Sequence, residues 1–190
     1  EAGGRSEAAS PVPGDAAAQL GWLMDRAQIA DVVARYCRGI DRRDFELVRS
    51  CYHSDGVDHH TGFTGSVDDF IEWIRIGLAQ FGMTQHLVGQ QLIELYGDVA
   101  RCESYGMASH WSGSGSDTTA DLTTGFRYVD RMERRDGRWA IAERYAIRDW
   151  TRADGVLVDR PAPGQESYAS RADALYLLGG FPSPPGEGER

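Results

Sequence analysis

The spacing of apolar residues changes once along this chain, and that change limits the folds it can adopt. Between residues 25 and 40, apolar side chains recur at every third or fourth position, which places them on one face of a helix. Beyond residue 83 the pattern becomes strand-like, in runs separated by turn-forming residues. These runs are 84–95, 99–111, 118–133 and 138–150. Helices followed by an antiparallel meander predict an α+β fold, with helices packed on one face of a curved sheet.

Local start signals support three helices. Asp25 with Gln28 is a plausible cap for the helix over residues 25–40, and Asp44 precedes a short second helix. A short strand is expected from Gly56 to Phe63, followed by a third helix capped by Ser66 with Asp69.

With 190 residues, 41% of them hydrophobic, the chain can bury one good core. We expect a disordered tail over residues 1–21, a folded domain over 22–150 and an extension over 151–190. The extension contains a short apolar island, Ala172 to Leu178, that is expected to cover a pocket or a subunit interface.

The formal charge of −9 argues against nucleic acid and anionic membrane surfaces as partners, since both bind clustered Lys and Arg. No apolar run approaches the roughly 20 residues of a membrane helix, so a soluble cytoplasmic protein is expected. Cys37, Cys51 and Cys102 are odd in number and lie in apolar patterns, which favours reduced core thiols.

Several familiar catalytic motifs are missing: the phosphate-binding loop, GxGxxG, GxSxG and paired CxxC. The remaining candidates are polar residues scattered over the expected elements. They are Tyr36, Asp41, His59, His60, His86, His110 and Arg148.

Each candidate also has a purely structural interpretation. Tyr36 lies on an apolar helical stripe, as core tyrosines do, and Asp41 at a helix end is as typical of a turn as of catalysis. His86 is compatible with an ordinary hydrogen-bonded imidazole, and Arg148 with half of a strand ion pair.

The cluster of His53, Asp58, His59 and His60 has the ligand types of a metal site. Neighbouring residues on a strand point to opposite faces, so only Asp58 and His60 share a side. No third ligand follows at a fitting interval, and no metal or other cofactor is expected.

Three segments resemble the nuclear-transport-factor-2-like superfamily, in particular its SnoaL-like enzymes. The segment Ala34–Val48 is similar to the opening helix, Thr84–Gln90 to the strand that carries the catalytic histidine of scytalone dehydratase, and Asp136–Ile141 to the last hairpin. The resemblance covers about Trp22 to Trp150 and implies a cone-like sheet that encloses a pocket.

The resemblance also implies which residues form the site. It concerns three enzymes of the superfamily: scytalone dehydratase, bile-acid 7α-dehydratase and hexachlorocyclohexane dehydrochlorinase. Asp41 matches the aspartate that orients a catalytic histidine, and His86 matches that histidine. Tyr36 and Arg148 match a pocket tyrosine and arginine of the bile-acid enzyme. The chain departs from these enzymes at two positions, which leaves open the group that polarises the substrate oxygen. His60 falls where the dehydratases carry a tyrosine, and His110 falls close to a pocket histidine.

A neutral histidine held by a carboxylate can accept a proton near neutral pH, where its reference pKa is about 6.5. The expected function is therefore cofactor-independent dehydration of a small, hydrophobic, oxygenated molecule such as a steroid or polyketide. Tyr36, His60 or Arg148 is expected to polarise the substrate oxygen, and His86 or His110 to return the proton.

Isomerisation and polyketide cyclisation use the same groups and remain open, as does a non-catalytic binding or assembly module. A homo-oligomer is expected, a trimer or a dimer, because helices on one face of the sheet leave the other partly apolar.

Overall fold

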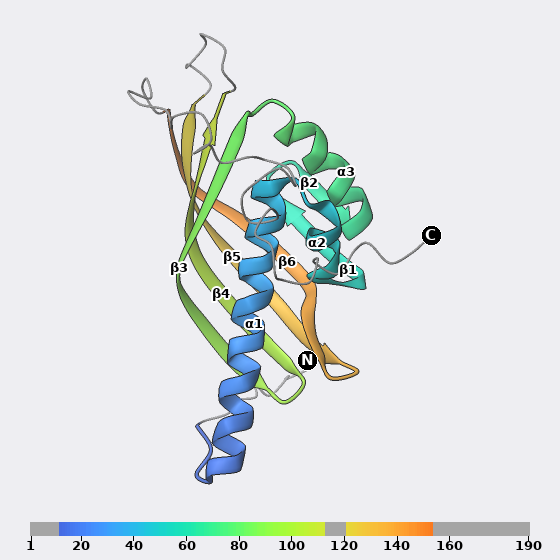
Figure 1. Cartoon of the computed structure of the whole chain (residues 1–190), viewed down its shortest axis with the longest axis vertical. Coiled ribbons are helices and arrows are strands. Elements are labelled where there is room, and N and C mark those ends of the chain that lie inside the picture. Colours follow the sequence, from blue (N-terminus) through green and yellow to red (C-terminus); the bar gives the residue numbers. More distant parts are fainter. Residues whose placement is uncertain (1–11, 113–120, 154–190) are drawn as a thin grey trace, which may run out of the picture.

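A computed structural model describes residues 12–112 and 121–153 of the chain (Figure 1). The elements follow one another as α1 (Ala16–Arg42), α2 (Phe45–Ser50), β1 (Tyr52–His60), β2 (Phe63–Ser66), α3 (Val67–Leu78), β3 (Met83–Tyr96), β4 (Val99–Trp111), β5 (Leu122–Arg135) and β6 (Arg138–Ala153). The strands form one six-stranded sheet in the order β2-β1-β6-β5-β4-β3. The prediction of an α+β fold is confirmed.

The long meander predicted from the sequence is present as β3 to β6, paired antiparallel throughout. The single strand expected at 56–63 is wrong, because the segment folds as a hairpin of β1 and β2. Gly62 adopts a φ of 87° in the connecting turn, a conformation that suits glycine. β1 also pairs in parallel with β6, so the hairpin extends the meander on one side.

Helix α1 begins at Ala16, earlier than the expected start at residue 25. Asp15 is its N-cap and accepts a hydrogen bond from the Ala18 amide. The first turns are exposed and alanine-rich, so helix propensity forms them without the apolar periodicity that a sequence search requires. The other two caps, Asp44 and Ser66, lie where the sequence places them.

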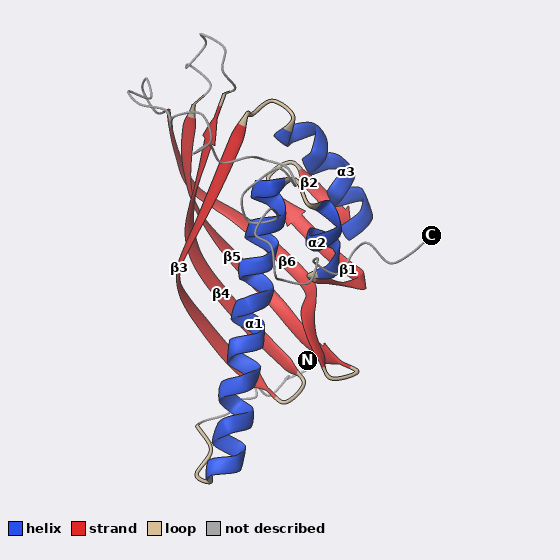
Figure 2. Ribbon diagram, in the orientation of Figure 1, coloured by secondary structure: helices blue, strands red, loops and turns tan. Residues whose placement is uncertain are grey.

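The sheet curves around α1, which lies along its concave side, while α2 and α3 lie beside the β1–β2 hairpin (Figure 2). The apolar stripe of α1 is the part that meets the sheet, and its residues are buried. It consists of Ile29, Val32, Val33, Tyr36, Cys37 and Ile40. Burial of this stripe fixes the rotation of α1 and therefore the direction in which its last turn faces.

The three cysteines are buried and free, as the sequence predicts. Burial raises the pKa of Cys37 to about 12 and that of Cys51 to about 11, so these thiols stay uncharged. The expected loop after Ser112 and the Ala172–Leu178 island lie outside the described residues. Within the described ranges, no helix is long and apolar enough to cross a bilayer.

Candidate active site

Asp41 and His86 are in direct contact, although 45 residues separate them in the sequence. The distance from His86 Nδ1 to Asp41 Oδ1 is 2.6 Å, and the His86 amide donates to Asp41 Oδ2 at 2.9 Å. The two side chains are only 8% and 10% exposed. Because a carboxylate can only accept, the imidazole proton lies on Nδ1, and Nε2 of a neutral His86 carries a free lone pair.

The end of α1 holds the carboxylate in place. Asp41 lies in the last turn, and Arg43 directly after it adopts a left-handed φ of 57°. The Arg43 guanidinium donates to the carbonyl oxygens of Leu78 and Phe81 and to the hydroxyl of Thr84. Thr84 in turn donates to Asp41 Oδ1 at 3.0 Å. Arg43 therefore ties the helix end to α3 and to the start of β3.

A bulge in β3 decides which side chains face inward. The register with β4 shifts between Val88 and Gln91. Before the shift, His86 lies on the inner side while Leu87 is 63% exposed; after it, Ile93 is buried while Leu92 is exposed. Strict alternation would place His86 and Leu92 on the same face.

His86 lines a cavity of about 320 Å³ between the sheet, the end of α1 and α3. Most of the lining is apolar, and the polar side chains converge on this lining from different elements. The lining includes Tyr36, Ile40, His60, Trp73, Phe81, His86, His110, Phe126 and Arg148. Its volume is at the lower end of the range for small-molecule sites, roughly 300–1,000 Å³.

Tyr36 is buried at this cavity, with its ring beneath the Arg144 guanidinium at 4.1 Å. Arg144 is itself fully buried and forms a two-point ion pair with Asp130. Burial, followed by the charge of Asp58, raises the pKa of Tyr36 well above its ordinary value. The Tyr36 phenol therefore remains protonated at neutral pH.

His110 lies beside His86, with ring centroids 6.1 Å apart, and its buried Nδ1 has no hydrogen-bond partner among the described residues. Burial, followed by the nearby His86, lowers the pKa of His110 to about 4. At neutral pH its imidazole is uncharged, so it is a poor proton donor to a leaving hydroxyl.

His60 reaches the same cavity from the end of β1, and its Nδ1 contacts the Asp58 carboxylate. Asp58 is completely buried and also accepts a hydrogen bond from the Tyr52 hydroxyl at 2.5 Å. His59 lies on the opposite face, where it contacts Glu143 and stacks on Tyr145. This agrees with the strand alternation predicted for the pair.

Arg148 also borders the cavity, but its residue is exposed, so it lies at the rim. Five of the six predicted site residues line one cavity, namely Tyr36, His60, His86, His110 and Arg148, and the sixth, Asp41, contacts His86 from the end of α1. The sequence analysis did not assign functional roles to Thr84, Arg43 and Asp58. Thr84 and Asp58 each lie two positions before a cavity histidine on the same strand, and this spacing predicts that they face the same side as that histidine. No comparable spacing in the sequence indicates Arg43.

A six-stranded curved sheet with N-terminal helices on its concave side is the nuclear-transport-factor-2-like fold. Residues 22–145 match the SnoaL-like domain, and the chain belongs to this family. No curated protein matches the sequence.

Solved structures share the fold at low identity. A putative scytalone dehydratase from Novosphingobium aromaticivorans is 18% identical with a TM-score of 0.62, over 76% of this chain and 97% of that one. Hexachlorocyclohexane dehydrochlorinase LinA-type3 from Novosphingobium barchaimii is 16% identical with a TM-score of 0.67, over 75% and 99%. Rv3472 of Mycobacterium tuberculosis, described as of unknown function, is 26% identical with a TM-score of 0.58, over 68% and 74%.

Proposed function

We propose that this protein is a cofactor-independent dehydratase that acts on a small, hydrophobic, oxygenated molecule. The observation that carries the proposal is the 2.6 Å contact between Asp41 and His86 at the wall of a mostly apolar cavity. The dehydratase and dehydrochlorinase names among the structural matches are in keeping with elimination chemistry, although their low identity supports the fold alone.

In the proposed reaction, Nε2 of His86 removes a proton from a carbon next to an oxygen-activated centre. Asp41 keeps the imidazole in the Nδ1–H form and stabilises the imidazolium that results. The C–H electron pair first moves onto the activating oxygen group as an enolate. It then forms the double bond as the C–O bond breaks, and the departing hydroxide leaves as water after it receives a proton. Apolar walls keep bulk water away from the base and favour a substrate with little charge.

The substrate is expected to enter past the exposed Arg148. Within the described ranges, the Arg148 side chain forms no ion pair or hydrogen bond. A guanidinium in this position suits a substrate whose outer end carries a carboxylate or another oxygen group.

The test is a panel of hydroxylated steroids and polyketide fragments, incubated with the full chain and analysed by mass for loss of water. We expect at least one compound to lose water, and His86→Gln to lower that rate by about 10²-fold or more because the base is gone. His59→Gln is the matched control, since His59 lies on the other face of the sheet.

A new ring or a shifted double bond at unchanged mass would instead identify a cyclase or an isomerase. Tight binding without any product would identify a binding module, which would exclude the catalytic proposal.

A further inference from the structure

The cavity holds a second histidine–carboxylate pair, Asp58 with His60, that differs chemically from the first. Each pair joins Nδ1 of a histidine to a buried carboxylate, and each histidine lines the cavity. They come from distant strands: β1 lies near one edge of the sheet, and β3 forms the other edge. A molecule in the cavity therefore meets an imidazole from each of two separate walls.

The two carboxylates are stabilised in different ways. Asp41 receives three hydrogen bonds, from the Thr84 hydroxyl, the His86 amide and the His86 ring. The Arg43 cation donates to the same Thr84 hydroxyl. Asp41 therefore has donors and a nearby positive charge even when His86 is neutral, which leaves His86 free to act as a base.

Asp58 has fewer partners and is buried more deeply. Its side chain is 0% exposed, one oxygen receives the Tyr52 hydroxyl, and the other contacts His60. Among the described residues, His60 is the cation-forming side chain in contact with Asp58. The buried Arg144 lies opposite Asp58 in the register of β1 and β6, but its guanidinium forms its ion pair with Asp130. A buried carboxylate requires a compensating charge, and the His60 ring is the group placed to supply it.

The surroundings of His60 also keep it in one orientation. Its ring stacks on Phe70 at 4.8 Å and contacts Trp73 at 5.9 Å. With Nδ1 directed at Asp58, Nε2–H is the ring donor left for the cavity. The neighbouring candidates are less suitable: His110 is uncharged at neutral pH, and the Tyr36 phenol holds its proton firmly.

We propose that His60 is the catalytic acid of this site, that Asp58 is its positioning residue, and that the pair works opposite the Asp41–His86 base. This inference rests on the proposed dehydration. His86 Nε2 takes the carbon-bound proton, and the C–H electron pair moves onto the activating oxygen group as an enolate. The enolate then forms the double bond as the C–O bond breaks. His60 Nε2 gives its proton to the departing oxygen, which leaves as water. His86 ends protonated and His60 neutral, and exchange with solvent restores both.

The protonation states can be measured without a substrate. In ¹⁵N-labelled full-length protein at neutral pH, long-range ¹H–¹⁵N spectra distinguish imidazole nitrogens that carry a proton from those that do not. With signals assigned through His60→Gln and His86→Gln, we expect both nitrogens of His60 and only Nδ1 of His86 to be protonated. Asp58→Asn is expected to return His60 to its neutral form, a change that a merely structural Asp58 would not cause. A bare nitrogen on His60 in the unaltered protein would overturn the proposal.

The second experiment uses a compound from the panel that loses water. An acid-deficient His60→Gln protein is expected to lose water about 10²-fold or more slowly, yet still to exchange the carbon-bound proton with deuterated solvent. His59→Gln, on the same strand and the opposite face, is expected to match the unaltered protein. Undiminished water loss by His60→Gln would refute the acid role and leave the proposed dehydration intact. If the unaltered protein releases no water from any compound, the proposed function fails, and the spectra alone decide whether His60 is charged.

Discussion

The Asp41 carboxylate determines which nitrogen of His86 is available to a substrate. An amide at position 41 retains the shape of the side chain but can offer its NH₂ group to the ring, which permits the wrong tautomer. We expect Asp41→Asn to lower the rate of water loss by about 10²- to 10⁴-fold. Asp44→Asn is the control, because Asp44 caps α2 through the Leu47 amide and asparagine caps helices as well.

The burial of His110 predicts that the stability of the protein depends on pH. Burial lowers its pKa to about 4, so the unfolded chain, with a value near 6.5, binds the proton first as the pH falls. The stability associated with neutral His110 is complete above pH 6.5 and declines toward pH 4, by about 3 kcal/mol at pH 4.

His110→Gln removes this titration. Urea unfolding of the two proteins at pH 7 and pH 4 measures the difference, and the variant should lose less stability between these pH values. Equal losses in the two proteins would show that His110 is not the group responsible.

At this scale the sequence carried much of the information, since five of the six residues selected for the site line the cavity and the sixth, Asp41, contacts His86. It could not assign a charge state to each histidine. That distinction comes from partners such as Arg43, which reaches Asp41 only through the Thr84 hydroxyl after the chain has folded. Similarly, the Asp58–His60 spacing showed a shared face but not that Asp58 is buried.

At the scale of elements, the close packing of α1 against α2 fixes the end of α1, where Asp41 contacts β3. A Cβ at Gly39 would lie 2.7 Å from the Val48 side chain and 3.0 Å from the backbone of α2. The two helices therefore pack closely at a position where only glycine fits without displacement.

We expect Gly39→Ala to lower the free energy of unfolding by about 1–3 kcal/mol through overpacking. Gly21→Ala, in an exposed turn of the same helix with nothing within 4 Å of the added Cβ, should instead raise it by up to about 1 kcal/mol. Urea denaturation of both variants measures the contrast, and a stabilising Gly39→Ala would contradict the close packing.

Helix caps and turn residues predicted most of the elements, but two features could not be predicted from the sequence. The exposed start of α1 has no apolar face to reveal it. The bulge in β3 inverts the inside-outside alternation after Val88, so the direction of His86 depended on pairing with β4 rather than on its own strand.

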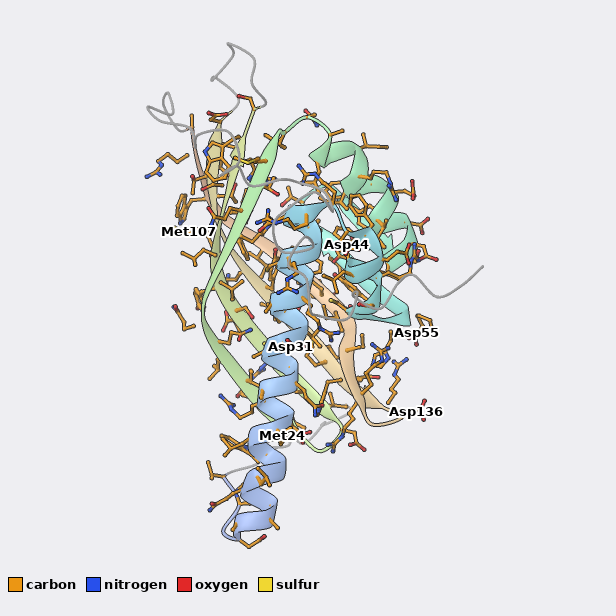
Figure 3. All side chains as sticks on the ribbon, viewed as in Figure 1. Met24, Asp31, Asp44, Asp55, Met107 and Asp136 are labelled. Carbon is orange, nitrogen blue, oxygen red and sulfur yellow. The ribbon has the colours of Figure 1, made fainter. Side chains whose placement is uncertain are left out.

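At the scale of the whole molecule, the outer face of the sheet exposes a row of large apolar side chains. The row crosses the sheet in register: Leu87 on β3 lies opposite Met107 on β4, and Met107 lies opposite Gly125 on β5. Gly125 in turn lies opposite Trp150 on β6, whose ring covers it. Leu87, Met107 and Trp150 are each at least 45% exposed, and Met107 lies on the side of the sheet away from α1 (Figure 3). We propose that a second copy of this chain covers this row.

Sedimentation velocity of the full chain is expected to show a dimer or a trimer that Met107→Glu shifts toward the monomer. Ile76→Glu alters an exposed apolar residue on α3 and should leave the mass unchanged. A monomeric unaltered protein would refute self-association through this face.

The central claim is that His86, held by Asp41, removes a proton from carbon inside the cavity. The most direct measurement is deuterium incorporation from heavy water into the panel compounds, followed by mass spectrometry, for the unaltered protein and for His86→Gln. The account predicts incorporation at the carbon next to the activating oxygen group, abolished in His86→Gln and retained in His59→Gln. Equal incorporation with and without His86 would contradict it.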